Sequence, residues 1–176
     1  MDIQGFFGIC LDRVEPDCKV LDLGSGDGEF AQMFLERGAI VTAVDINPPK
    51  FKDSNLIIEK MKIEDFCASN KIDKYDLIFA RNIIQFLDKS WVLETLFPWI
   101  ENHLTPDGLV AIKTFFQESE PPLTNRTKSL YERKELLSCF MAWKELYSEE
   151  VSRFDFDMDG QAHKFFISSL IAQKSN

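Results

Sequence analysis

Two spacings of hydrophobic residues alternate along the chain. Short runs of apolar, often β-branched residues predict buried strands, whereas apolar residues that recur every three or four positions predict amphipathic helices. The expected strands are residues 19–24, 39–45, 56–58, 75–80, 109–116, 143–151 and 163–174. The expected helices are residues 1–18, 29–37, 91–103 and 130–141. This order predicts an α/β fold, with an open, mostly parallel sheet, helices on both faces and a terminal pair of strands.

The length of the chain and its polar breaks predict one domain. A chain of 176 residues can build one domain with a core, and we expect residues 1–176 to form it. Residues 116–130 are mostly polar and contain two prolines, so we expect a mobile loop there.

The composition is that of an ordinary globular protein with excess negative charge. Hydrophobic residues make up 45% of the chain, and the net charge is −9 at neutral pH. Because proteins that bind nucleic acids usually carry a basic face, we expect no nucleic-acid partner. Four scattered cysteines and two histidines form no metal-binding pattern, so we expect no metal. Neither a signal-peptide pattern nor a membrane-spanning run is evident, so we expect a cytoplasmic protein without membrane contact.

A glycine-rich turn follows the first expected strand. Gly24, Gly26 and Gly28 lie between that strand and a helix that begins near Glu29. In an open parallel sheet this turn lies at the ligand edge, and glycines let a ligand approach the backbone closely. Asp22, just before the glycines, would repel a pyrophosphate but attract an ammonium group. Since the spacing also departs from the dinucleotide fingerprint and lacks the lysine of a P-loop, a ligand with a cationic part is favoured.

A second acidic residue ends the next strand. Asp45 lies 23 residues after Asp22 and is placed to accept hydrogen bonds from both hydroxyls of a ribose. Sites for nicotinamide and for S-adenosylmethionine share this feature, so Asp45 by itself leaves both cofactor classes open. The spacing of the glycines and the charge of Asp22 disfavour the nicotinamide.

Four segments resemble, in order, the motifs of the class I S-adenosylmethionine-dependent methyltransferases. They are VLDLGSGDG at 20–28, VDIN at 44–47, YDLIFARNIIQFL at 75–87 and HLTPDGLVAIK at 103–113. The resemblance covers nearly the whole chain and implies a Rossmann-like fold of seven strands, the last antiparallel. Residues 131–174 are weakly similar to tellurite-resistance and related small-molecule methyltransferases.

The resemblance implies S-adenosyl-L-methionine as the cofactor and assigns roles by position. Asp22 would hold the methionine amino group, Asp45 the ribose hydroxyls, and Ile46 would lie against the adenine. Arg81 would supply backbone contacts near the sulfonium. The full set of cofactor-binding residues expected in this way is Asp22, Gly24, Ser25, Gly26, Asp45, Ile46, Ile63 and Arg81.

The implied reaction is in-line methyl transfer to a small-molecule acceptor. The sulfonium is already activated, so positioning and desolvation can carry much of the rate, and the sequence indicates no general base. We expect Asn82, Gln85 and Phe86 to contact the acceptor, together with Arg81 and the loop at 116–130. The alternative is a catalytically inactive, methyltransferase-like binding or scaffold subunit that acts through a protein partner, which the sequence also accommodates.

Overall fold

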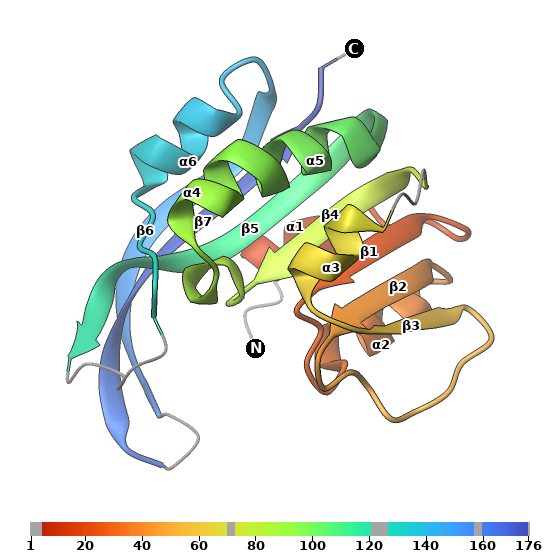
Figure 1. Cartoon of the computed structure of the whole chain (residues 1–176), viewed down its shortest axis with the longest axis horizontal. Helices are drawn as coiled ribbons and strands as arrows, with labels where there is room; N and C mark the ends of the chain where they lie inside the picture. The colour runs from red at the N-terminus through yellow and green to blue at the C-terminus, as the bar shows by residue number, and fades with distance from the viewer. Residues whose placement is uncertain (1–4, 70–72, 121–126, 157–159, 176) are drawn as a thin grey trace.

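Seven strands form one sheet in the order β3-β2-β1-β4-β5-β7-β6 (Figure 1). The computed structural model describes residues 5–69, 73–120, 127–156 and 160–175. The strands are β1 (Lys19–Leu23), β2 (Ile40–Asp45), β3 (Leu56–Lys60), β4 (Tyr75–Arg81), β5 (Leu104–Glu120), β6 (Lys144–Phe156) and β7 (Ala162–Gln173). Only β7 runs antiparallel to its neighbours, β5 and β6, so the predicted Rossmann-like sheet is confirmed for the described residues.

Helices cover both faces of this sheet. They are α1 (Phe6–Leu11), α2 (Glu29–Glu36), α3 (Ile63–Ala68), η1 (Ile84–Phe86), α4 (Lys89–Trp91), η2 (Val92–Leu96), α5 (Phe97–His103) and α6 (Arg133–Cys139). Residues of α1 and α2 share one hydrophobic core, and residues of α3, α5 and α6 share the other. Helices on both faces were expected from the sequence, and this prediction is confirmed as well.

Strand alternation decides which core each residue joins. In β4, Leu77 and Phe79 point to the α1/α2 face, whereas Ile78 and Ala80 point to the opposite face. Phe79 is fully buried, and its ring contacts four other phenylalanines of the α1/α2 core: Phe6, Phe7, Phe30 and Phe34. Because side chains alternate along a strand, Arg81 lies on the α1/α2 face as well.

The long helical segment after β4 begins earlier than the expected Trp91. The Asp88 carboxylate accepts a hydrogen bond from the Trp91 N–H at 2.9 Å, so it caps a helix that begins at Lys89. Pro98 does not end this helix. It has no N–H to donate to the carbonyl four residues earlier, and that carbonyl lies in the π-helical turn Val92–Leu96.

The N-terminal helix is shorter than the expected 1–18. It spans Phe6–Leu11, and residues 1–4 lie outside the described residues. Pro16 has no N–H to donate, and Asp17 has a left-handed φ of 66°, so neither residue continues a helix toward β1.

The loop expected at 116–130 begins later than predicted. β5 continues to Glu120 and pairs with β7, with Gln117 opposite Phe166 and Glu120 opposite Lys164. Residues 121–126 lie outside the described residues. The ends of β5, β6 and β7 (residues 114–120, 150–156 and 162–168) extend beyond the other strands as one arm (Figure 1). The strand β7 supplies the pairing partners for the end of β5. Residues 116–130 alone do not reveal this pairing, because β7 is distant in the sequence.

Among the described residues, no helix has the length and apolar character needed to cross a membrane. The same part of the chain holds no group of three or more metal-ligating side chains. The four cysteines are free thiols.

Candidate functional site

The glycine-rich turn between β1 and α2 adopts a backbone that only glycine takes without strain. Gly24, Gly26 and Gly28 have φ of 75°, 54° and 90°. A Cβ on Gly24 would lie 2.5 Å from the Ile83 side chain, so the connection after β4 packs directly on the turn. A Cβ on Gly26 would meet nothing within 4 Å, so that face of the turn is open to a ligand.

Asp45, at the end of β2, holds this turn in place. One of its carboxylate oxygens accepts the N–H of Gly26 at 3.0 Å, and the other accepts the N–H of Asn47 at 2.7 Å. A carboxylate has about four lone-pair positions, so both oxygens can still accept hydrogen bonds from ribose hydroxyls. The expected ribose role of Asp45 stays a prediction with compatible geometry.

Asp22 is a buried acid without a hydrogen-bond partner on one oxygen. Its side chain is 3% exposed, and its Oδ2 has no partner among the described residues. Burial chiefly, and Asp45 in addition, raise the pKa of the Asp22 carboxyl from 3.8 to about 7, against the opposing effect of Arg81. The Oγ of Ser25 is also buried without a partner in that part of the chain. These unsatisfied acceptors beside an open glycine turn fit an ammonium-bearing ligand.

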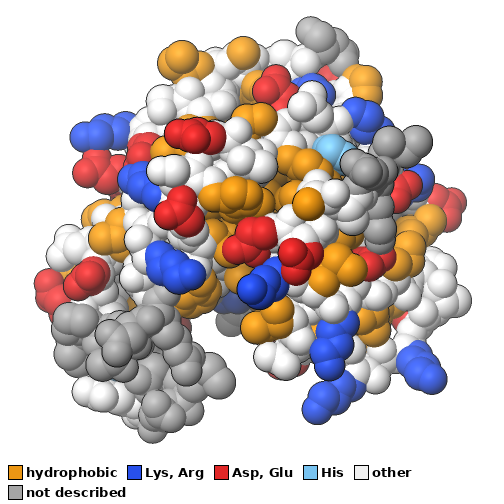
Figure 2. Space-filling model, in the orientation of Figure 1, with side chains coloured by type: hydrophobic (Ala, Val, Ile, Leu, Met, Phe, Trp, Pro, Cys, Tyr) orange, Lys and Arg blue, Asp and Glu red, His pale blue; other side chains and the backbone are white. Residues whose placement is uncertain are grey.

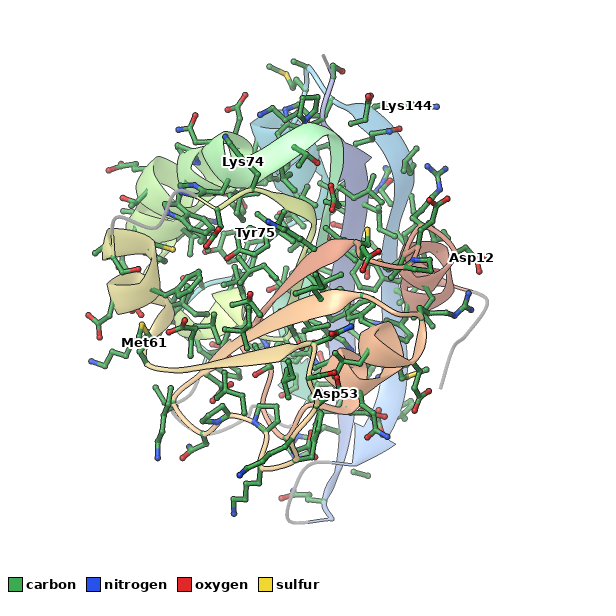
Figure 3. All side chains as sticks on the ribbon, turned by 90° about the vertical axis from the view of Figure 1, so that its right-hand side faces the viewer. Asp12, Asp53, Met61, Lys74, Tyr75 and Lys144 are labelled. Carbon is green, nitrogen blue, oxygen red and sulfur yellow. The ribbon has the colours of Figure 1, made fainter. Side chains whose placement is uncertain are left out.

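An open cleft of about 560 Å3, here named the isoleucine cleft, lies between the turn and α3. Hydrophobic side chains gather at the centre of the face that carries α3 and α5 (Figure 2). Met61 lies where β3 leads into α3 (Figure 3). The structure brings together Gly24, Asp45, Ile46, Ile63 and Phe86, which all line this cleft. Its mostly apolar walls, with Asp45 at one side, suit a flat nucleobase attached to a ribose.

Arg81 lies on the opposite face of the sheet from the isoleucine cleft. Its guanidinium lies over the Phe30 ring at 4.4 Å, within a separate hollow of about 330 Å3. We name this hollow the basic pocket; its charged lining residues are Glu29, Arg81, Lys113, Arg153 and Asp155. The structure therefore places Arg81 apart from Ile46 and Ile63, on the side where Asp22 points.

The two polar residues expected to contact the acceptor do not line either hollow. Asn82 has a left-handed φ of 54°, and its N–H donates to the Lys113 carbonyl at 2.7 Å. Gln85 is fully buried and accepts a hydrogen bond from the Thr114 hydroxyl at 3.2 Å. The Gln85 carbonyl also accepts the Lys128 N–H at 2.7 Å. Gln85 thus connects the turn after β4 to β5 and to the segment before α6, and its role toward an acceptor stays a prediction.

Sequence reasoning did not single out Ile83, Lys113 or Arg153. Ile83 lies inside the segment at 75–87 that resembles a family motif, so its position after β4 was a usable signal. Lys113 and Arg153 are single cations on strands, and their place beside Arg81 depends on which strands are neighbours and how they are paired.

Comparison with known proteins agrees with this architecture. TehB from Haemophilus influenzae has a TM-score of 0.76 at 20% identity, covering 96% of this chain and 61% of TehB. The Burkholderia thailandensis 1,6-didemethyltoxoflavin-N1-methyltransferase, with bound 1,6-didemethyltoxoflavin and S-adenosylhomocysteine, has a TM-score of 0.73 at 19% identity, covering 97% of this chain and 76% of its own. A SAM-dependent methyltransferase from Methanosarcina mazei has a TM-score of 0.72 at 15% identity, covering 97% and 99%. This chain thus spans less than two thirds of TehB.

The sequence comparison decides the family. No curated protein matches the sequence. A family model described as a methyltransferase domain matches residues 9–157, which include the strands β1 to β6. The predicted family is therefore confirmed, and this chain belongs to the methyltransferase domain family.

Proposed function

We propose that the protein is an S-adenosylmethionine-dependent methyltransferase that acts on a small-molecule acceptor by in-line transfer. The observation that carries the proposal is the buried Asp22 carboxylate, whose Oδ2 has no partner among the described residues, beside an open glycine turn held by Asp45. Asp22 would bind the methionine ammonium group, Asp45 the ribose, and Ile46 and Ile63 the adenine. The solved B. thailandensis relative, which holds 1,6-didemethyltoxoflavin and S-adenosylhomocysteine, supports a small-molecule acceptor here.

Methyl transfer from a sulfonium depends more on the orientation of donor and acceptor than on acid–base groups. When bound, S-adenosylmethionine would supply an activated methyl carbon, and its transfer to the acceptor would leave the bonding electron pair on sulfur. Residues of this chain then have to align the two partners and keep water away, as apolar walls such as Ile83 can do. A single domain over residues 1–176 and a cytoplasmic location remain predictions of the sequence.

Calorimetry with three ligands tests the proposal. S-adenosylmethionine and S-adenosylhomocysteine are expected to bind, whereas NAD is expected to bind at least 10-fold more weakly because Asp22 opposes a pyrophosphate. If neither sulfur ligand binds at millimolar concentration, the proposed function is wrong and the scaffold alternative takes its place.

Asp45→Ala is expected to weaken S-adenosylmethionine binding by about 10-fold or more. The change removes one or two hydrogen bonds to the ribose and releases the N–H of Gly26 from its partner. Asp53→Ala is the matched control, because Asp53 makes the same kind of local bond, to the N–H of Asn55 at 2.8 Å. Titration calorimetry should show unchanged affinity for the control. Equal affinity of Asp45→Ala and the native protein would contradict the assignment of Asp45.

A further inference from the structure

The basic pocket contains two cations that face each other across neighbouring strands. Arg81 of β4 is in register with Lys113 of β5, and both side chains line the pocket. Like charges directly opposite each other in a sheet repel, so this pairing costs stability. The part of the chain that the structure describes offers the Arg81 guanidinium a ring contact with Phe30 but no hydrogen bond or ion pair. An anion between the two side chains would be attracted by both of them.

A third cation comes from the arm. Arg153 of β6 lines the same pocket and pairs with Asp155 at 3.1 Å. Burial lowers the pKa of the Arg81 guanidinium; Glu29 raises it and Arg153 lowers it again. Among the described lining residues, the three cations exceed the two carboxylates, in a chain whose net charge is −9. The pocket is therefore a local positive site on an acidic protein.

The remaining walls of the pocket are aromatic. Phe30 lies beneath Arg81, and the Phe6 ring lies 5.8 Å from the Lys113 ammonium group. Phe7 completes this side and packs edge-on against Phe30. A hollow of about 330 Å3 lined by three aromatic rings, three cations and two carboxylates suits a small molecule that has an apolar body and a negative group.

The pocket also adjoins the place proposed for the amino-acid end of the donor. Asp22 of β1 is in register with Phe79 of β4, and Arg81 follows Phe79 by two positions on the same face. The charges of Asp22 and Arg81 interact, since each affects the pKa of the other. If Asp22 binds the methionine ammonium group, the amino-acid end of the donor lies beside Arg81, at the border of the basic pocket.

We propose that the basic pocket binds the methyl acceptor and that this acceptor is a small anion with an apolar body. Lys113 and Arg153 hold its negative group, and Phe6 and Phe30 contact its body. The inference rests on the proposed function and adds the chemical class of the acceptor to it. Because the attraction is electrostatic, binding weakens as salt concentration rises.

Benzoate and benzamide are suitable probes, because they share a shape and differ in charge. With S-adenosylhomocysteine present at saturation, benzoate is expected to bind at least 10-fold more tightly than benzamide in a titration followed by NMR or calorimetry. Equal affinities of the two compounds, or benzoate binding that does not respond to salt, would overturn the assignment of an anionic acceptor.

Two single substitutions locate the site. Lys113→Gln and Arg153→Gln should each lower benzoate affinity about 10-fold while changing S-adenosylhomocysteine affinity less than twofold. Lys144→Gln is the control, because Lys144 is an exposed cation at the opposite end of β6 from the arm (Figure 3). Thermal melting checks that each variant folds, and exposed Arg153 provides the test if Lys113→Gln is unstable.

The two proposals fail in different ways. Native benzoate affinity in both variants would overturn the acceptor site alone. If the native protein does not bind S-adenosylhomocysteine, the proposed function itself is wrong.

Discussion

Asp22→Asn is expected to stabilise the unliganded protein at pH 8 and to weaken its binding of S-adenosylmethionine about 100-fold. The native carboxylate is buried with an unpartnered oxygen, so its charge costs stability when no cation is bound. Asparagine has nearly the same shape without the charge. Removing one member of a buried charge pair typically costs about 2–5 kcal/mol of binding, which corresponds to a loss of about 30-fold or more in affinity. Stability and binding should therefore change in opposite directions.

The pH dependence follows from the sign of the pKa shift. The folded protein holds the Asp22 pKa at about 7, above the ordinary value of 3.8. Below about pH 4 the group is protonated in the folded and unfolded states alike, so its contribution to stability is fully present there. The free energy of unfolding then falls as the pH rises toward 7, because the unfolded state ionises first. At one pKa unit per 1.36 kcal/mol, Asp22→Asn should gain about 2–4 kcal/mol at pH 8 and almost nothing at pH 4.

Binding should depend on pH in the opposite sense. The ammonium group of the donor needs an ionised Asp22, so affinity is expected to rise up to tenfold per unit between pH 5.5 and 7 and then to level off. Calorimetry across this pH range measures the affinity for S-adenosylmethionine, and urea unfolding at pH 4 and pH 8 measures stability. Asp27→Asn is the control, because Asp27 is an exposed acid in the same turn. Native affinity that stays flat with pH, or equal affinity of Asp22→Asn, would show that Asp22 does not bind the ammonium group.

Gly24→Ala is expected to lower the free energy of unfolding by about 3 kcal/mol or more. The left-handed φ of 75° costs about 1–2 kcal/mol for any residue with a Cβ. In addition, the new methyl group would lie 2.5 Å from Cγ1 and 2.7 Å from Cβ of Ile83. The Cβ of Ile83 is fixed by its backbone and cannot swing away, so the turn after β4 has to move.

Two other glycines separate the causes of this effect. Gly160 has a φ of 78° and nothing within 4 Å of a Cβ, so Gly160→Ala measures the backbone strain alone. Gly26→Ala should also cost only that strain, yet lower S-adenosylmethionine affinity more than 10-fold, because its Cβ would occupy the space proposed for the ligand. Urea unfolding of the three variants measures their stability, and calorimetry measures their affinity for S-adenosylmethionine. If Gly24→Ala is as stable as Gly160→Ala, Ile83 does not press on the turn; if Gly26→Ala binds normally, the turn is not the donor site.

Local sequence was enough to predict the part of the site nearest to β1 and β2. A strand, a turn that needs left-handed glycines and the following helix are consecutive in the chain, so their residues report on one another directly. Asp22, Gly24, Gly26 and Asp45 consequently come together as expected at the ends of β1 and β2. The same reasoning identified the family, because its motifs are short and ordered.

The polarity of residues that follow a strand predicted their surroundings less well than the glycine turn did. Gln85 follows β4, where the sequence predicts a residue that contacts the acceptor, and the structure buries it fully and bonds it to Thr114 of β5. The loop expected at 116–130 fails for a related reason, since Phe166 and Lys164 of β7 supply pairing partners for residues up to Glu120. In both places a distant segment supplies hydrogen-bond partners, to the Gln85 Oε1 and to the backbone of β5, that the local sequence does not reveal.

The sequence by itself determined the order of the seven strands, the glycine turn and the acids on either side of it, whereas α3 was not expected from the sequence. Each of these depends on the conformation or charge of residues that are close in the chain. Only the tertiary structure decided that Lys113 and Arg153 lie beside Arg81. That arrangement requires β5 to pair with β4 in one register and β6 to reach the same face through β7. Register is set by packing across the whole sheet, so local patterns do not contain it.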